Sequence, residues 1–377
     1  MTVGGDSVEN KKITSHQLFT FTALSTLGGS ILVASSTIAT AAGRDAWLSG
    51  PVTIASGLVM MWVYCYLGTR FEGLTLIGML RKVFGKWLGT IVSGGYFVYF
   101  FVTAYGIPWY IGGFGSSVMP ETPVLIPQTV FIAVIIVGLF YGIETVARAS
   151  EVFITVFTVL FLGFVLLVLP NAKVDYILPV LENGISPVLK GSIFLSAFVS
   201  IQNITVLMIY PIAVKDKKAG KKAVFKGFLW ANAIVSVNIF IAILVLGHGI
   251  VADSAFATIL LAREINVMAV LTRMEYVVSV VWLLSEFVIG FLYFYATTMS
   301  ASEIIGLKDH RKIILPFGLI MLVISLIDNP GTIEHADYIL GGYVPLAILF
   351  GFIVPVIMLA VYVVRRITNP SFGIQSS

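Results

Sequence analysis

The strongest candidate for chemistry in this 377-residue chain is one glutamate inside a long apolar segment. Glu286 lies well within the apolar segment 276–302. An ionised carboxylate at this depth in a bilayer is costly unless it is protonated, paired or hydrated. Glu286 is therefore either a group that faces a cavity beside a ligand or a neutral acid that hydrogen-bonds another helix and fixes packing. We favour the first and predict that Glu286 contacts the ligand.

Two other apolar segments carry flexible or polar residues at their centres. Segment 17–41 contains Gly28-Gly29 among hydroxyl residues, and each glycine weakens a helix by about 1 kcal/mol relative to alanine. Segment 191–213 contains polar residues at 200–203, and amides at that depth need partners or a cavity. Close helix packing is the alternative explanation for the glycines. Because both segments are interrupted, we predict a paired unwound site whose ligand contacts are Gly28, Gly29, Ser30, Ser200, Gln202 and Asn203.

Aromatic side chains could complete the wall of such a site. Segments 87–113 and 276–302 are both rich in tyrosine. Tyrosine and tryptophan also pack between helices or concentrate at membrane interfaces. Of these residues, we select Tyr96 and Tyr293 as candidate ligand contacts.

The elements that must position these residues are membrane spans. Hydrophobic residues make up 58% of the chain, charged residues 11%, and the mean hydropathy is +0.99. A soluble domain has roughly 25% charged residues. Most of the apolar segments reach the 17–25 residues that a bilayer core of about 30 Å requires. We predict ten spans, at residues 17–41, 47–68, 87–113, 124–141, 152–169, 191–213, 228–246, 276–302, 314–327 and 342–364.

The basic residues give this topology an orientation. Six lysines lie between Lys215 and Lys226, and such loops stay on the cytoplasmic side. With ten alternating spans, the 23 Lys and Arg residues divide into 18 inside and 5 outside, and an odd number of spans would destroy this division. Both termini are therefore predicted to be cytoplasmic. The inside set includes Lys11 and Lys12, and the outside set includes Arg44, Lys173, Lys190, Arg263 and Arg273.

Ten spans divide into two sets of five, and the second set then has inverted orientation. In transporters with such repeats, the site lies at the midplane, where the first helix of each half is broken. We predict one membrane domain over residues 1–377. Its first repeat covers residues 17–169 and its second covers 191–364, with cytoplasmic tails at 1–12 and 365–377.

Four stretches carry a resemblance to a known family. They are the stretch from Tyr141 to Glu151, which contains Glu144 and Arg148; Leu178-Pro179-Val180-Leu181 with Gly184 and Pro187; the lysine-rich loop; and Arg273-Met274-Glu275. Their order resembles that of the B subunits of spore germination receptors, in the amino acid-polyamine-organocation superfamily. The resemblance extends over nearly the whole chain. One departure is that segment 152–169 has no ionisable residue, whereas some proton-coupled relatives carry a lysine there.

The resemblance implies a LeuT-like fold with broken helices 1 and 6, and a role in sensing nutrient germinants in the inner membrane of an endospore. It also implies a small-molecule germinant, commonly an amino acid, and partners that are an A-type membrane subunit and a C-type lipoprotein. Two other functions fit the same helices: a proton- or sodium-coupled amino acid permease, and an ion or water channel subunit. Fold alone cannot choose among them.

Glu144, Arg148 and Glu151 have spacings of four and three residues, which bring side chains together on a helix surface. We predict a cytoplasmic ion-pair cluster, with a gate as the alternative. The four histidines show no spacing typical of metal ligands, and no Walker-type phosphate loop occurs. The sequence therefore predicts no enzymatic activity, no metal and no cofactor. Nucleic acid is not a predicted partner, because the basic residues are explained by topology.

Overall fold

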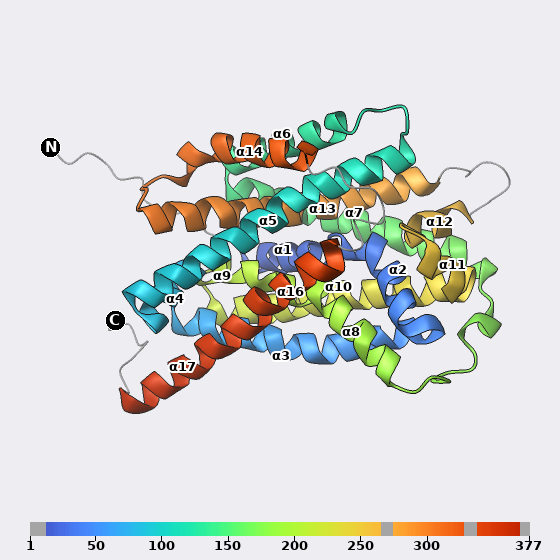
Figure 1. Ribbon diagram of the computed structural model, residues 1–377, viewed down its shortest axis with the longest axis horizontal. Coiled ribbons are helices and arrows are strands. Elements are labelled where there is room, and N and C mark those ends of the chain that lie inside the picture. The colour runs from blue at the N-terminus through green and yellow to red at the C-terminus, as the bar shows by residue number, and fades with distance from the viewer. Residues whose placement is uncertain (1–12, 265–273, 328–337, 370–377) are drawn as a thin grey trace.

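The computed structural model describes residues 13–264, 274–327 and 338–369, with side chains omitted at 338–340, and every regular element in these ranges is a helix (Figure 1). Lys11, Lys12, Arg273, the tail 1–12 and the end of the C-terminal tail at 370–377 lie outside the described residues.

The first half of the chain forms a helix pair, a 3-10 turn and five further helices. In order these are α1 (Ser15–Leu27), α2 (Ser30–Ala42), η2 (Gly43–Leu48), α3 (Ser49–Arg70), α4 (Leu76–Phe84), α5 (Lys86–Val118), α6 (Leu125–Tyr141) and α7 (Ile143–Val168).

The second half begins with short turns and contains a second interrupted helix. Its elements are η3 (Leu169–Asn171), η4 (Val174–Ile177), α8 (Ser186–Val199), η5 (Ile201–Thr205), α9 (Val206–Ala213), α10 (Lys217–Leu246), α11 (His248–Asp253), α12 (Ala257–Arg263), α13 (Met274–Ile305), η6 (His310–Ile313), α14 (Ile314–Ile327), η7 (Tyr338–Tyr343), α16 (Val344–Ala347), η8 (Ile348–Ile353) and α17 (Val354–Thr368). The elements η7 and η8 are π-helical.

Eight helical stretches of the described chain are long and apolar enough to cross a membrane, and the chain is an integral membrane protein. The helix α6, at 17 residues, falls just below that length. The predicted ninth span coincides with α14, and η6 extends it to 18 residues. The all-helical membrane fold and the interruptions near residues 28 and 200 are confirmed, while the count of ten spans stays a prediction.

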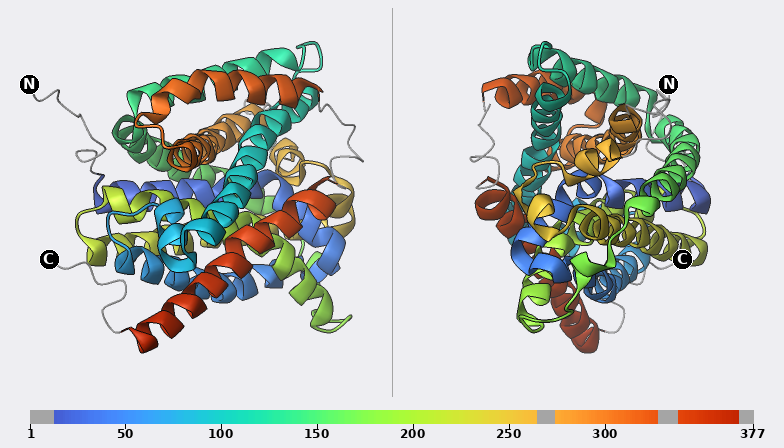
Figure 2. Two further views of the ribbon diagram at one scale, coloured as in Figure 1. Left: turned by 60° about the vertical axis from the view of Figure 1, so that its left-hand side comes forward. Right: turned by 90° about the vertical axis from the view of Figure 1, so that its right-hand side faces the viewer.

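The helices α1 and α13 lie at the centre of the molecule. Helix α1 packs against α10, α7 and α13, and α13 packs against α5, α6 and α7. Helices α6 and α14 lie side by side at one edge (Figure 2). The central position of α1 and α13 puts the glycine pair and Glu286 in the same part of the core.

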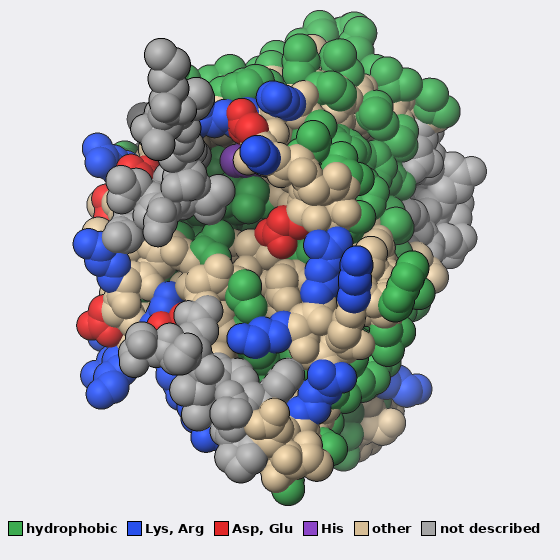
Figure 3. Space-filling view, turned by 90° about the vertical axis from the view of Figure 1, so that its left-hand side faces the viewer, with side chains coloured by type: hydrophobic (Ala, Val, Ile, Leu, Met, Phe, Trp, Pro, Cys, Tyr) green, Lys and Arg blue, Asp and Glu red, His purple; other side chains and the backbone are tan. Residues whose placement is uncertain are grey.

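One end of the bundle carries many basic side chains. The described N-terminal end lies there, since the Ile13 amide donates to the carbonyl oxygen of Ala213 at 3.0 Å. In the lysine-rich segment, the Lys217 ammonium donates to the carbonyl oxygens of Pro211 (2.8 Å) and Val214 (2.7 Å) at the end of α9. Figure 3 shows Lys and Arg side chains gathered on this face, which also carries the end of α17 (Figure 1). This common position agrees with the predicted charge division.

Candidate functional site

The break between α1 and α2 is made by two glycines. Helix α1 begins with a capping box between Thr14 and Gln17 and ends at Leu27. The amide of Gly28, the next residue, donates to the carbonyl oxygen of Leu24 at 3.1 Å. A Cβ atom on Gly28 would lie 3.2 Å from Cδ1 of Ile289, so glycine permits α13 to approach closely. Gly29 precedes α2 and supplies no capping side chain. The first amides of α2 therefore give this break a partial positive charge at mid-membrane.

The second break lies opposite the first. Here α8 ends at Val199, the chain passes through the 3-10 turn η5, and α9 begins at Val206. The Gln202 amide donates to the carbonyl oxygen of Ser25 at 2.9 Å, and the Asn203 amide donates to Thr26 Oγ1 at 2.9 Å. Polar side chains of η5 thus satisfy groups of α1, as backbone inside a membrane requires.

Three tyrosines support the backbone of η5. The Tyr293 hydroxyl donates to the carbonyl oxygen of Gln202 at 3.0 Å, and the Tyr64 hydroxyl donates to that of Ile201 at 3.2 Å. Tyr99 and Tyr293 share a hydroxyl–hydroxyl hydrogen bond of 3.2 Å. These bonds hold the unwound segment against α3 and α13, and Tyr99 of α5 supports Tyr293.

A cavity of about 100 Å³ lies between the two breaks, which is room for a small molecule or a few waters. The Trp282 indole donates to Glu286 Oε1 at 3.0 Å, and a Cβ atom on Gly29 would lie 3.3 Å from the same oxygen. The carboxyl group of Glu286 therefore faces the start of α2. The lining residues are Gly29, Val33, Val102, Thr103, Gly106, Ile107, Trp109, Tyr110, Phe198, Gln202, Glu286, Ile289 and Tyr343. We name this the central cavity.

The structure brings Gly29, Gln202 and Glu286 together around the central cavity. Gly28, Asn203 and Tyr293 lie directly behind that wall, in the contacts described above. The Ser30 hydroxyl donates to the carbonyl oxygens of Thr26 (3.1 Å) and Leu27, so it closes the end of α1.

Two predicted site residues lie elsewhere. Tyr96 donates to the carbonyl oxygen of Phe350 at 2.7 Å and packs on its ring, 5.1 Å between centroids. Ser200 lines a different cavity, of about 460 Å³, between α3, α8 and η8, together with Ser192 and Ser196. The hydroxyl of Ser200 is buried and has no hydrogen-bond partner among the described residues.

Sequence reasoning missed Phe198 and Tyr343, which line the central cavity. It also missed Trp282, which donates a hydrogen bond to the Glu286 carboxyl group. Trp282 precedes Glu286 by four residues, and this helical spacing was a usable signal. Trp109 and Tyr110 were visible as aromatic residues of segment 87–113 but were not selected. Tyr343 could not be selected by helical spacing, because its π-helical turn does not have the 3.6-residue period of an α-helix.

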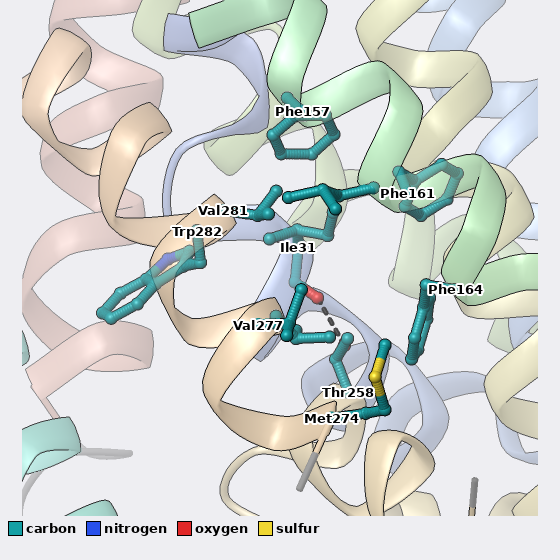
Figure 4. Close-up of a pocket in the computed structure, with 11 residues that line it drawn as sticks. Ile31, Phe157, Phe161, Phe164, Thr258, Met274, Val277, Val281 and Trp282 are labelled. Carbon is teal, nitrogen blue, oxygen red and sulfur yellow. Dashed lines mark hydrogen bonds between the residues drawn. The ribbon is translucent and has the colours of Figure 1, made fainter. Parts of the chain in front are cut away.

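A smaller cavity lies on the other side of α2 and is apolar (Figure 4). Its volume is about 20 Å³, about enough for one water molecule. Phenylalanines of α7 and valines of α13 form its wall, and Thr258 donates to the carbonyl oxygen of Ile31 at 2.6 Å. The size and apolar lining make it a packing space, so the central cavity is the better candidate for a ligand.

The predicted cluster of Glu144, Arg148 and Glu151 lies in the first turns of α7. An ion pair of 3.8 Å joins Arg44 to Glu182 near the opposite end of the bundle. The position of these three residues on one helix leaves the ion-pair cluster a prediction.

Comparison with known proteins decides the family. The sequence profile of the family described as "Spore germination protein" matches residues 12–333. The chain belongs to this spore germination family. It is 27% identical over 337 residues to spore germination protein KB of Bacillus subtilis, covering 88% of each chain. It is 24% identical over 339 residues to spore germination protein YndE of the same organism, covering 84% of this chain and 86% of that one. The predicted resemblance is confirmed.

Solved structures show that this member of the spore germination family has a transporter-like fold. MHP1, a nucleobase-cation-symport-1 family transporter with bromovinylhydantoin bound, superposes with a TM-score of 0.62 and 14% identity, covering 100% of this chain and 85% of that one. MhsT in complex with L-phenylalanine superposes with a TM-score of 0.64 and 14% identity, covering 95% of this chain and 99% of that one. The LeuT-like fold with broken helices 1 and 6 is thereby confirmed.

Proposed function

We propose that this chain is the germinant-binding subunit of a nutrient receptor in the spore membrane. It binds an amino acid or similar small molecule in the central cavity and signals to its partners. The observation that carries the proposal is the convergence of Gly29, Gln202 and Glu286, from two broken helices and α13, on one cavity at mid-membrane. Family membership supports the germination role, and the solved neighbours with small molecules bound support a ligand site in this fold.

The proposed partners are an A-type membrane subunit and a C-type lipoprotein, and the proposed location is the inner membrane of the endospore with both termini cytoplasmic. The resemblance of the chain to B subunits supports the partners. The basic face shared by α4, α10 and the end of α17 supports the orientation. We also propose that the two five-helix repeats are residues 17–169 and 191–364, because each then begins with a broken helix.

The experiment that tests the proposal is Gly29→Leu, assayed in spores that contain this receptor alone. Gly29 has φ −56° and ψ −19°, which any residue adopts, so the backbone tolerates the change. The added side chain points toward Glu286 and fills the cavity. We expect normal membrane abundance and loss of the nutrient response.

The matched control is Gly163→Leu in α7, where an added Cβ meets nothing within 4 Å. This variant should germinate like the unchanged protein. An undiminished response of Gly29→Leu, at unchanged nutrient sensitivity, would place the binding site elsewhere and refute the proposal. Uptake of labelled amino acid by the reconstituted chain alone would instead favour a permease.

A further inference from the structure

Among the described residues, the lining of the central cavity includes one acidic side chain and no basic one. Among the described residues that line it, Glu286 is the one with a charged side chain. Gln202, the amide in the wall, already donates to the carbonyl oxygens of Ser25 (2.9 Å) and Thr26 (3.4 Å). A ligand carboxylate would therefore find neither an ammonium nor a guanidinium group among these residues.

The start of α2 is the other feature that could hold a carboxylate, but Glu286 already faces it. A Cβ atom on Gly29 would lie 3.3 Å from Glu286 Oε1. The start of a helix favours anions, and in this fold it is a place for the carboxylate of a substrate. Here a carboxyl group of the protein already occupies that place. A ligand carboxylate at the same place would compete with Glu286 for the first amides of α2, and it would meet like charge whenever Glu286 is ionised.

Aromatic rings form much of the remaining wall. Trp109 and Tyr110 come from α5, Phe198 from α8 and Tyr343 from η7, so three separate segments contribute rings to one small cavity. Aromatic faces attract ammonium groups, and this attraction strengthens when the cation is removed from water. A cation that pairs with a buried carboxylate likewise offsets much of the cost of burying that charge. A single carboxylate among aromatic rings is the chemistry that recognises an amine.

We infer that the group recognised in the central cavity is the ammonium of a small amine, and that a ligand carboxylate is not required. The ammonium pairs with Glu286 and lies against the aromatic rings. Simple amines and amino acid amides are thus ligands as well as free amino acids. This inference rests on the proposed function and narrows its ligand class.

The test compares four probes on the purified chain in lipid nanodiscs, with binding followed by saturation-transfer NMR. Valine carries both groups, isobutylamine and valinamide carry the ammonium without the carboxylate, and N-acetylvaline carries the carboxylate without the ammonium. We expect isobutylamine and valinamide to bind at least about tenfold more tightly than N-acetylvaline, since only they pair with the buried carboxylate.

Three variants, at two residues, locate the interaction. Glu286→Gln should weaken isobutylamine binding by about tenfold or more, because the amide cannot supply the charge. Tyr343→Phe should keep the affinity and Tyr343→Leu should lower it severalfold, because only the ring interacts with the cation. The matched control is Glu303→Gln, on the same helix but outside the cavity, where the carboxylate accepts from Thr75 at 2.7 Å. It should bind isobutylamine normally.

Equal binding of N-acetylvaline and isobutylamine would overturn the inference, as would unchanged isobutylamine binding in Glu286→Gln. Binding of valine without binding of either amine probe would also overturn it, yet would leave the proposed function standing. Failure of both amines and of valine would overturn the inference too. The proposed function itself fails only if Gly29→Leu leaves the nutrient response of spores unchanged, so the two failures are distinguishable.

Discussion

The two helix breaks border the same cavity but differ in the side chains that they supply. The break between α1 and α2 consists of Gly28 and Gly29, which bring no side chain. The break at η5 consists of residues with polar side chains, and its amides at Gln202 and Asn203 hydrogen-bond α1. One break leaves space and open amides, whereas the other supplies the groups that hold the first in place.

The two breaks should therefore have different roles, one in ligand binding and the other in folding. Gly29 borders the cavity and lies close to Glu286, so changes there should alter ligand binding and leave folding intact. Asn203 is fully buried and its side chain hydrogen-bonds other groups of the protein, so changes there should alter folding first. The comparison predicts that loss of response with normal abundance is characteristic of α2, and that loss of abundance is characteristic of η5.

The largest effect should come from Asn203→Leu. Its amide donates to Thr26 Oγ1 and to the carbonyl oxygen of Val199 at 2.8 Å, and its oxygen accepts from Ser25 at 3.2 Å. Leaving such buried partners unsatisfied costs about 1–3 kcal/mol, and a change of this size lowers cellular abundance severalfold. Immunoblots of membrane fractions measure it.

The control is Asn232→Leu in α10. Asn232 is equally buried, but its amide donates to Phe228 in its own helix, at 3.0 Å. It should stay near normal abundance. If both variants were equally abundant, η5 would not be the supporting break and the comparison would fail.

Substitutions of Glu286, like those of Gly29, should abolish the nutrient response more readily than they lower protein abundance. Glu286→Gln keeps the shape and can still accept from Trp282, but it cannot ionise. We expect normal abundance and no response to the nutrient. Glu286→Leu also removes the acceptor of the Trp282 indole, so we expect no response and reduced abundance. Germination rate and protein level of both variants are measured together, and a normal response of either variant would contradict a ligand contact.

Tyr293→Phe should give a smaller and intermediate effect. The hydroxyl donates to Gln202 and shares a hydrogen bond with Tyr99, so it connects α13 to the supporting break without entering the cavity. One hydrogen bond contributes about 1 kcal/mol. We expect normal abundance and a nutrient concentration for half-maximal response that rises by up to about fivefold. A complete loss of response would instead make Tyr293 a direct ligand contact.

The sequence predicts the breaks better than it predicts the cavity wall. Adjacent glycines and buried amides disturb a helix whatever its neighbours are, so Gly29 and Gln202 were visible in the sequence. The rotation of a helix about its axis depends on packing with other helices. For this reason Ser200, two residues before Gln202, turns toward the cavity beside α3. Tyr343 reaches the central cavity from a π-helical turn that no simple period predicts.

The most direct test of the central claim is a structure of the receptor determined with its nutrient bound. The ligand should lie between the two breaks, in contact with Gly29, Gln202 and Glu286, with its ammonium next to the carboxylate. Ligand density in the cavity lined by Ser192, Ser196 and Ser200, or on a partner subunit with the central cavity empty, would contradict the account.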